Sequence, residues 1–301
     1  MKHKILIIDD EKIQAENIQK ALIQNNVSVV TDVAYQEDDI LKKISETYFN
    51  IAIVDLRMDN FSIDGFKIIS EIIEKNPFAK IIVCSAYLPE YKDNINDIIT
   101  TGRIASILDK SSFQDFVARI IVSINKIIKD YDDNPHLNQK NLEFLYSEVL
   151  NEKDNYTKGI RFEYFVTTLF SQMGFNSIIN RQKDKSLNEI DIIIRNDIKD
   201  NFFNKFKPYF LIECKNTIEQ VDKNQFIQFN SKIENAKALS NLGFIFTAKG
   251  FKRTAFIEAV RNSKEDHKIV FISSNEIKDI IYSESLISGL KNIIDNQVKD
   301  N

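Results

Sequence analysis

Apolar and polar positions alternate in a regular way along the first 130 residues. Five short apolar runs rich in β-branched residues predict buried strands over residues 4–9, 28–34, 51–58, 80–87 and 106–110. The stretch after each run has helical spacing and predicts a helix, over residues 12–24, 38–48, 64–75, 90–101 and 112–130. Five strand–helix repeats with mostly apolar strands predict an α/β domain with a doubly wound parallel sheet and helices on both faces.

The remaining residues follow a different order of elements. The sequence Asp-Asp-Asn-Pro at residues 132–135 predicts a break in the helical pattern. Beyond it, helices are predicted over residues 137–150, 157–174, 223–239 and 252–262, and strands over residues 176–180, 189–195, 209–216, 242–247 and 268–273. We therefore expect an N-terminal domain at residues 1–130, a helical linker at residues 131–156, and a C-terminal α/β domain with a mixed sheet at residues 157–301.

The composition is typical of a globular protein. The 301 residues are enough for two domains of ordinary size, and 43% of them are hydrophobic. Cys84 and Cys214 lie in predicted strands, where cysteine is usually a small core residue in a reducing compartment. No apolar run approaches 18 residues, which argues against a membrane span, and Asp9 and Asp10 end the first apolar run too early for a signal peptide. We expect a cytoplasmic protein.

Charge is unevenly distributed along the chain. The net charge is −4, and residues 1–130 carry 16 basic and 20 acidic side chains, so that the remainder is neutral. Neither half has the strongly basic composition of a general nucleic-acid-binding protein. An enzyme acting on nucleic acid is still compatible with this charge, because metal ions and a local basic patch can attract the phosphates.

Five polar residues coincide with the ends of the predicted strands in the first domain. In strand order they are Asp9 and Asp10, Asp55, Ser85 and Lys110. An aspartate after a strand is usually a turn residue or a helix cap. However, the active groups of a parallel sheet gather at the carboxyl ends of its strands. The coincidence of three carboxylates, a hydroxyl and an ammonium group at one edge favours a functional site.

This set of residues resembles the receiver domain of two-component response regulators, across residues 1–130. The resemblance implies a flavodoxin-like fold and a partner, either a sensor histidine kinase or a phosphotransfer protein. It implies that Asp55 accepts the phosphoryl group and forms an acyl phosphate. It further implies that Asp10, Asp55 and the backbone carbonyl of Arg57 bind Mg²⁺, with Asp9 acting through water.

The same resemblance implies that Ser85 and Lys110 hold the phosphoryl group and report its presence.

Three features depart from the family pattern. Ser111 stands where a proline usually follows the lysine, and Ile107 stands where an aromatic switch residue is usual. The loop at residues 56–65 is slightly longer than usual and lacks its proline. We therefore expect the phosphorylation chemistry without the usual aromatic switch.

Apolar residues recur at helical spacing along the predicted helix at residues 112–130. They are Phe113, Phe116, Val117, Ile120, Ile121, Ile124, Ile127 and Ile128. Part of this stripe must cover the domain's own sheet, and the helix is long enough to leave some apolar surface uncovered. Contact with a second copy in a homodimer and simple core packing both remain open. For the dimer contact, Ile124 and Ile128 are expected to face outward.

Two predicted strands of the second half carry charged residues that a buried strand normally excludes. Glu213 and Lys215 are two residues apart on one strand, so they point to the same face of the sheet. Asp191 lies on the preceding strand and could join them. A salt bridge at a sheet edge would explain Glu213 and Lys215 alone. Two carboxylates and an ammonium group on one face instead suit a divalent metal ion with a water molecule beside it.

The order of elements around these residues resembles the Mrr-like branch of the PD-(D/E)xK nuclease superfamily, across residues 157–273. The matching segments are residues 159–163 (Gly-Ile-Arg-Phe-Glu) and residues 188–191 (Asn-Glu-Ile-Asp), where Ile190 replaces the proline of the superfamily's name. The resemblance implies a restriction-endonuclease-like fold and phosphodiester hydrolysis in double-stranded DNA.

Specific roles follow from this second resemblance. It implies that Asp191, Glu213 and the Cys214 carbonyl bind Mg²⁺ or Mn²⁺. It implies that Lys215 orients or activates the attacking water. Glu163 and Gln225 would be accessory catalytic residues, although each alone is compatible with an ordinary solvated polar side chain.

Together, the two resemblances predict a response regulator that is phosphorylated on aspartate and controls a metal-dependent DNA endonuclease domain. One alternative is a phosphorylation-controlled module that binds DNA or protein through a catalytically idle nuclease fold. Another is a phosphate sink that competes for a kinase and needs no second domain. Failure to cut DNA after activation would favour the binding module, and an unchanged biology after deletion of residues 134–301 would favour the sink.

Overall fold

The computed structural model describes residues 3–27, 29–110, 112–134, 136–175, 177–183, 189–216, 219–262 and 266–299. Five residues that carried parts of the sequence predictions lie outside this set, namely Ser28, Ser111, Pro135, Asn176 and Asn188. The chain divides into two compact units, Met1–Asn141 and Leu142–Asn301. The division falls inside helix α6 (His136–Asn151). The domain limits expected at residues 130 and 156 stay a prediction.

The first unit contains a five-stranded parallel sheet. Its strands are β1 (His3–Ile8), β2 (Val29–Ala34), β3 (Ile51–Asp55), β4 (Lys80–Ser85) and β5 (Ile104–Asp109). Their order across the sheet is β2-β1-β3-β4-β5, with every neighbouring pair parallel. The strand order reverses between β1 and β3, so the predicted doubly wound architecture is confirmed.

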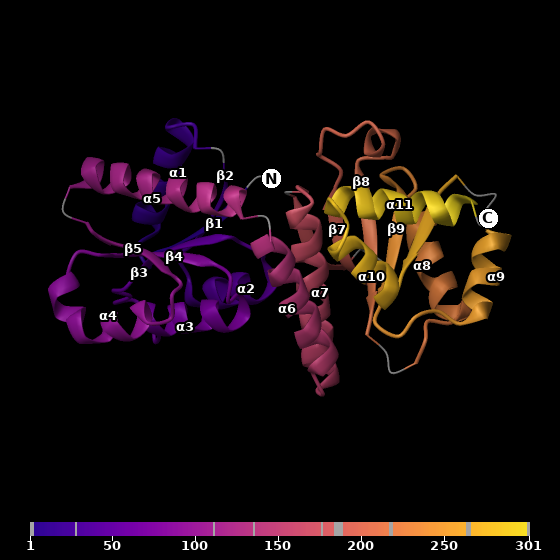
Figure 1. Cartoon of the computed structure of the whole chain (residues 1–301), viewed down its shortest axis with the longest axis horizontal. Coiled ribbons are helices and arrows are strands. Elements are labelled where there is room, and N and C mark those ends of the chain that lie inside the picture. The colour runs from indigo at the N-terminus through magenta and orange to yellow at the C-terminus, as the bar shows by residue number, and fades with distance from the viewer. Residues whose placement is uncertain are drawn as a thin grey trace. The chain divides into compact units, whose positions relative to one another are not determined.

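Helices cover both faces of this sheet (Figure 1). One face carries α1 (Lys12–Gln24) and α5 (Phe113–Asp133), and the other carries α2 (Glu37–Glu46), α3 (Gly65–Lys75) and α4 (Lys92–Ile99). A short 3-10 helix, Leu88–Tyr91, precedes α4. Side chains of β1 point alternately to the two faces of the sheet. Ile5 and Ile7 pack with α1 and α5, while Leu6 and Ile8 pack with α2 and α3.

Helix α5 departs from the prediction in two ways. Ile124 is fully buried, so the expectation that it faces outward is wrong; Ile128 is partly buried. Most of the apolar stripe covers the unit's own sheet, while Val122 and Phe113 are exposed, at 68% and 52%. The helix also continues past residue 130, because Tyr131 is buried and its hydroxyl donates to the Phe78 carbonyl at 2.6 Å.

The second unit contains a five-stranded mixed sheet, as predicted. Its strands are β6 (Ile178–Lys183), β7 (Glu189–Arg195), β8 (Tyr209–Lys215), β9 (Ser240–Thr247) and β10 (Lys268–Ile272). They lie in the order β10-β9-β8-β7-β6; β6, β7 and β8 pair antiparallel, and β8, β9 and β10 pair parallel. A short 3-10 helix, Phe203–Lys205, lies between β7 and β8 and buries Phe203 in the core.

Helices also cover both faces of the second sheet (Figure 1). Helices α7 (Asn155–Gln172), α10 (Ser274–Ile281) and α11 (Leu286–Lys299) share one core cluster, and α8 (Lys223–Asn235) and α9 (Arg253–Arg261) share the other. The sequence prediction ended at residue 273 and missed α10 and α11. Ser273 and Glu276 form a capping box at the start of α10, a signal that the sequence does contain. Among the described residues, no helix has the length and apolarity needed to cross a bilayer.

Gly65 sets how closely α3 approaches the end of β3. A Cβ atom at this position would lie 2.2 Å from the Asp55 carbonyl oxygen and 2.5 Å from the Leu56 Cα. These are backbone atoms, so Gly65→Ala must push α3 away from the sheet. We expect the free energy of unfolding to fall by about 1–3 kcal/mol, measured by urea denaturation. Gly159→Ala is the control, because a Cβ there meets no atom within 4 Å and alanine favours a helix. Equal stability of the two variants would contradict this account.

Candidate functional site

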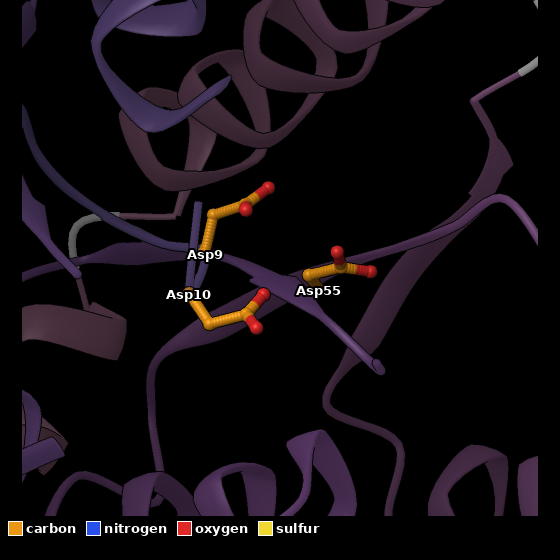
Figure 2. Close-up of side chains that lie close together, drawn as sticks. All are labelled: Asp9, Asp10 and Asp55. Carbon is orange, nitrogen blue, oxygen red and sulfur yellow. The ribbon is translucent and has the colours of Figure 1, made fainter. Parts of the chain in front are cut away.

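Three carboxylates lie together at the carboxyl edge of the first sheet. Asp9 and Asp10 follow β1 and Asp55 ends β3, and these strands are neighbours. One oxygen from each carboxylate lies within 4.8 Å of the others (Figure 2). Asp9 and Asp55 are buried, at 2% and 8% exposure, whereas Asp10 is partly exposed. The predicted grouping is therefore present in the structure.

Lys110 follows β5 and reaches across to these acids. Its Nζ lies 2.6 Å from Asp55 Oδ2 and 2.7 Å from Asp9 Oδ2, and it also donates to Gln14 Oε1 at 3.0 Å. Burial lowers the pKa of Lys110, but the two carboxylates outweigh burial and leave the pKa raised. The ammonium group therefore stays charged and bridges two strand ends that are far apart in the sequence.

Burial disfavours the ionised form of Asp9 and of Asp55, and Lys110 offsets this effect only in part. Burial raises the pKa of Asp55 to about 6 and the charge on Asp9 adds to this shift, while Lys110 opposes it. Burial likewise raises the pKa of Asp9, again against the effect of Lys110. Three clustered carboxylates facing one ammonium group provide the hard oxygen ligands that Mg²⁺ prefers. The residues present thus fit the expected magnesium ion.

A cavity of about 520 Å³ opens beside this cluster. It is lined by Asp10, Glu11, Gln14, Asp55, Arg57, Asp59, Asn60, Ala86, Tyr87 and Lys110. The Arg57 guanidinium lies 4.5 Å from the centroid of the Tyr87 ring, and its Nε donates to Asp59 Oδ2 at 2.7 Å. Ser85 is fully buried, and its hydroxyl accepts a hydrogen bond from the Tyr87 backbone N–H at 3.0 Å.

Asn60 also belongs to this site, and the sequence analysis missed it. Its backbone N–H and its side-chain Nδ2 both donate to Asp10 Oδ2, at 3.1 and 2.9 Å. Two residues later, Ser62 donates to Glu37 through its backbone N–H at 2.7 Å. The loop after β3 is therefore tied down at two points and fixes the orientation of Asp10. The loop's unusual length was the available signal, but only the fold shows what Asn60 contacts.

A second charged cluster lies on the sheet of the second unit. Asp191 on β7 and Glu213 on β8 come from antiparallel neighbours, whose register pairs Ile192 with Ile212. Asp191 Oδ2 accepts a hydrogen bond from the Cys214 backbone N–H at 2.7 Å. Lys215 Nζ lies 2.5 Å from Glu213 Oε1. The structure thus brings together the acids and the lysine that the sequence singled out.

Lys232 on α8 contributes a further cation that the sequence analysis missed. Its Nζ lies 2.8 Å from Glu213 Oε2, so each oxygen of the buried Glu213 carboxylate is paired with a different lysine. A lysine on a polar helix carries no signal of its own in the sequence. Only the packing of α8 beside β8 reveals it.

Asp191 sits in an environment that disfavours its charge. Burial, followed by the charge on Glu213, raises the pKa of Asp191 to about 7, and Glu163 on α7 adds a smaller contribution. The hydrogen bond from Cys214 and the charge on Lys215 oppose the shift. Glu163 therefore interacts electrostatically with Asp191, and a buried pair of carboxylates such as Asp191 and Glu213 fits a divalent cation.

Gln225 has a structural contact of its own. It sits in the first turn of α8, where its Oε1 accepts from the Asp222 backbone N–H at 3.1 Å while its own N–H donates to Asp222 at 3.1 Å. This reciprocal pair caps the helix. An accessory catalytic role for Gln225 stays a prediction.

Comparison with protein families matches both units. A response regulator receiver domain model matches residues 5–120, and a restriction endonuclease model of the Mrr catalytic type matches residues 155–281. The chemotaxis protein CheY of Listeria monocytogenes is 31% identical over 83 residues, which are 28% of this chain and 67% of that protein. The corresponding protein of Listeria innocua gives the same values.

Receiver domains are among the solved structures similar to this chain. A CheY-like receiver domain protein from Methanospirillum hungatei is 19% identical, over 43% of this chain and 99% of its own, with a TM-score of 0.36. The response regulator DrrB of Thermotoga maritima, an OmpR/PhoB homolog, is 16% identical with a TM-score of 0.36; the match spans 43% of this chain and 54% of DrrB. By its family match and its curated relatives, the chain belongs to the response regulator receiver family, and it carries a restriction endonuclease domain at residues 155–281.

Proposed function

We propose that phosphorylation of Asp55 in a receiver at residues 1–130 controls DNA cleavage by a nuclease domain at residues 157–301, through a helical linker at residues 131–156. The observation that carries this proposal is that one chain, matched by both families, holds a carboxylate–lysine cluster in each unit. Fold similarity alone would not supply a function, because function depends on the groups in the site.

The receiver cluster would perform phosphoryl transfer. An Asp55 carboxylate oxygen would attack the phosphorus of a phosphohistidine, so that the P–N bond breaks and an acyl phosphate forms. Lys110, already 2.6 Å from Asp55, would pair with the phosphoryl oxygens, and Ser85 would donate a hydrogen bond to them. Asp10, Asp55 and the Arg57 carbonyl would hold Mg²⁺, with Asp9 in support; the ion would offset negative charge on the transferred group.

The second cluster would hydrolyse a phosphodiester. Asp191, Glu213 and the Cys214 carbonyl would hold Mg²⁺ or Mn²⁺, which would polarise the scissile phosphate when bound. The hydrogen bond from the Cys214 N–H keeps one Asp191 oxygen in a fixed direction. Lys215 would orient or activate the water, whose oxygen bonds to phosphorus as a P–O bond of the DNA backbone breaks. Glu163 would assist as an accessory acid through its electrostatic interaction with Asp191.

Two partners follow from these activities. A sensor histidine kinase or a phosphotransfer protein would supply the phosphoryl group, and double-stranded DNA would be the substrate, both in the cytoplasm. Cutting both strands requires two active sites, so we expect a homodimer that forms on phosphorylation.

Val122→Glu on the exposed side of α5 should reduce the amount of phosphorylated dimer, measured by sedimentation velocity, without affecting labelling of Asp55. Phosphorylation-dependent cutting with an unchanged mass distribution would exclude dimer control.

The direct test is a cleavage assay on double-stranded DNA with Mg²⁺ or Mn²⁺, with and without acetyl phosphate. Cleavage that depends on both the metal and acetyl phosphate is the expected result. If the phosphorylated protein binds DNA but cuts none, the domain is a binding module. If it does neither, the second domain has no role in DNA chemistry.

Protons should compete with Mg²⁺ at the receiver site. Because the pKa of Asp55 is raised to about 6 in the folded protein, its ionisation destabilises the metal-free protein as pH rises through that value. Bound Mg²⁺ offsets this charge, so Mg²⁺ should raise the melting temperature more at about pH 7.5 than at about pH 5. Differential scanning calorimetry is the measurement, with Asp191→Ala as the parent, because the second proposed metal site has a raised pKa of its own. Adding Asp55→Asn to this parent should remove most of the difference. An effect of Mg²⁺ that is independent of pH in the parent would contradict the assignment.

A further inference from the structure

Glu213 is held between two lysines that come from different elements. Lys215 follows it on β8 and contacts Oε1 at 2.5 Å, while Lys232 reaches it from α8 and contacts Oε2 at 2.8 Å. The Glu213 side chain is only 5% exposed and that of Lys232 is 17% exposed. Charged groups at this depth are placed by the fold and not by chance surface contact.

Helix α8 holds Lys232 firmly in place. Phe229 and Ile233, three residues before and one residue after Lys232 in the helix, are buried against β9. A Cβ atom at Gly243 on β9 would lie 2.2 Å from Ile233 Cδ1 and 3.0 Å from the Phe229 ring. The helix therefore lies as close to the sheet as a glycine permits. Because β9 is the neighbour of β8, this packing brings Lys232 over Glu213.

The pairing of both carboxylate oxygens with lysines has a consequence for metal binding. A divalent cation that binds one Glu213 oxygen repels the ammonium group paired with that oxygen, because cations a few ångströms apart repel each other. Lys215 shares the sheet face with Glu213 and Asp191, where the water would lie. Lys232 instead comes from α8 and reaches Glu213 through a flexible four-carbon stem. A displaced ammonium group needs another anion, and the backbone phosphate of DNA is the anion that this site would receive.

We propose that Lys232 is a second active-site lysine, which neutralises Glu213 in the metal-free protein and contacts the DNA phosphate once Glu213 ligates the metal. This inference rests on the proposed nuclease function. It assigns to α8 a role in coupling metal binding to DNA binding, because the same ammonium group opposes the first and supports the second.

The test uses the full chain carrying Asp10→Asn, which disables the receiver metal site. Calorimetric titration with Mn²⁺ should show that Lys232→Ala binds the metal about 3- to 10-fold more tightly, the effect of removing a competing ion pair. Binding to a short duplex in Ca²⁺, followed by fluorescence anisotropy, should weaken, and the slope of log affinity against log salt should fall by about 0.9. Lys232→Met, which keeps the aliphatic stem, should behave alike, and Lys232→Arg should restore DNA affinity.

Lys223→Ala is the matched control on the same helix. Lys223 pairs with Glu258 at 3.2 Å and is 44% exposed, so both affinities should stay as in the parent. The inference is overturned if Lys232→Ala and Lys232→Met keep the parent's affinities while Asp191→Ala abolishes Mn²⁺ binding. If the parent has no Mn²⁺ site that depends on Asp191, the nuclease function itself fails and the inference falls with it. The two failures are therefore distinguishable.

Discussion

Asp55→Asn is expected to reduce phosphorylation by acetyl phosphate, or by a cognate kinase, to the background of the assay. An amide cannot form the acyl phosphate, since its nitrogen is a poor nucleophile and its oxygen carries no full charge. The substitution preserves the shape of the side chain and leaves Lys110 its contact with Asp9 at 2.7 Å. The fold should therefore persist, and removal of a buried charge should leave the melting temperature at or above that of the wild type.

Asp59→Asn is the control for this prediction. Asp59 lies four residues beyond Asp55 and lines the same cavity, but its side chain is 64% exposed and paired with Arg57. The Asp59→Asn variant should be phosphorylated to the same extent as the wild type, measured by phosphate-affinity electrophoresis or by intact mass. Labelling that survives Asp55→Asn would show that the phosphoacceptor lies elsewhere.

Asp191→Ala and Glu213→Ala are each expected to eliminate metal-dependent DNA cleavage. Each substitution removes a carboxylate ligand from a site in which both acids are required to offset a divalent charge. Lys215→Ala should keep Mn²⁺ binding and slow cleavage by roughly 10²- to 10³-fold, because it removes a group that acts on the water and on charge in the transition state. Single-turnover cleavage of a labelled duplex distinguishes the absent cleavage of the two acid variants from the slowed cleavage of Lys215→Ala.

Asp197→Ala provides the matched control for the acid substitutions. Asp197 follows β7 only six residues after Asp191, and its carboxylate accepts from Ser177 Oγ at 3.3 Å, away from the charged cluster. Cleavage by this variant should match the wild type. Undiminished cutting by Asp191→Ala, with protein purity checked by mass spectrometry, would remove Asp191 from the active site.

The parts of this fold that the sequence predicts are those with local or periodic causes. The carboxyl ends of parallel strands lie at one edge of the sheet regardless of the loop conformations. The pattern of predicted strands therefore placed Asp9, Asp10, Asp55 and Lys110 together correctly. The alternation of side chains along a strand placed Glu213 and Lys215 on one face for the same kind of reason.

The parts that the sequence misses depend on contacts between distant segments. Asn60 and Lys232 are ordinary polar residues until the fold brings them to Asp10 and Glu213. Ile124 was assigned to the wrong face because the helix stripe is wide, and spacing alone does not show which edge of a stripe the sheet covers.

The stacking of Arg57 on Tyr87 makes residue 87 a suitable position for a fluorescent reporter residue. The chain contains no tryptophan, so Tyr87→Trp would introduce the only indole, at a residue that is 45% exposed and lines the cavity beside Asp55. The guanidinium lies 4.5 Å from the present ring, and its movement would alter the emission of an indole in that place. Changes around Asp55 could then be followed in real time by intrinsic fluorescence, without any attached dye.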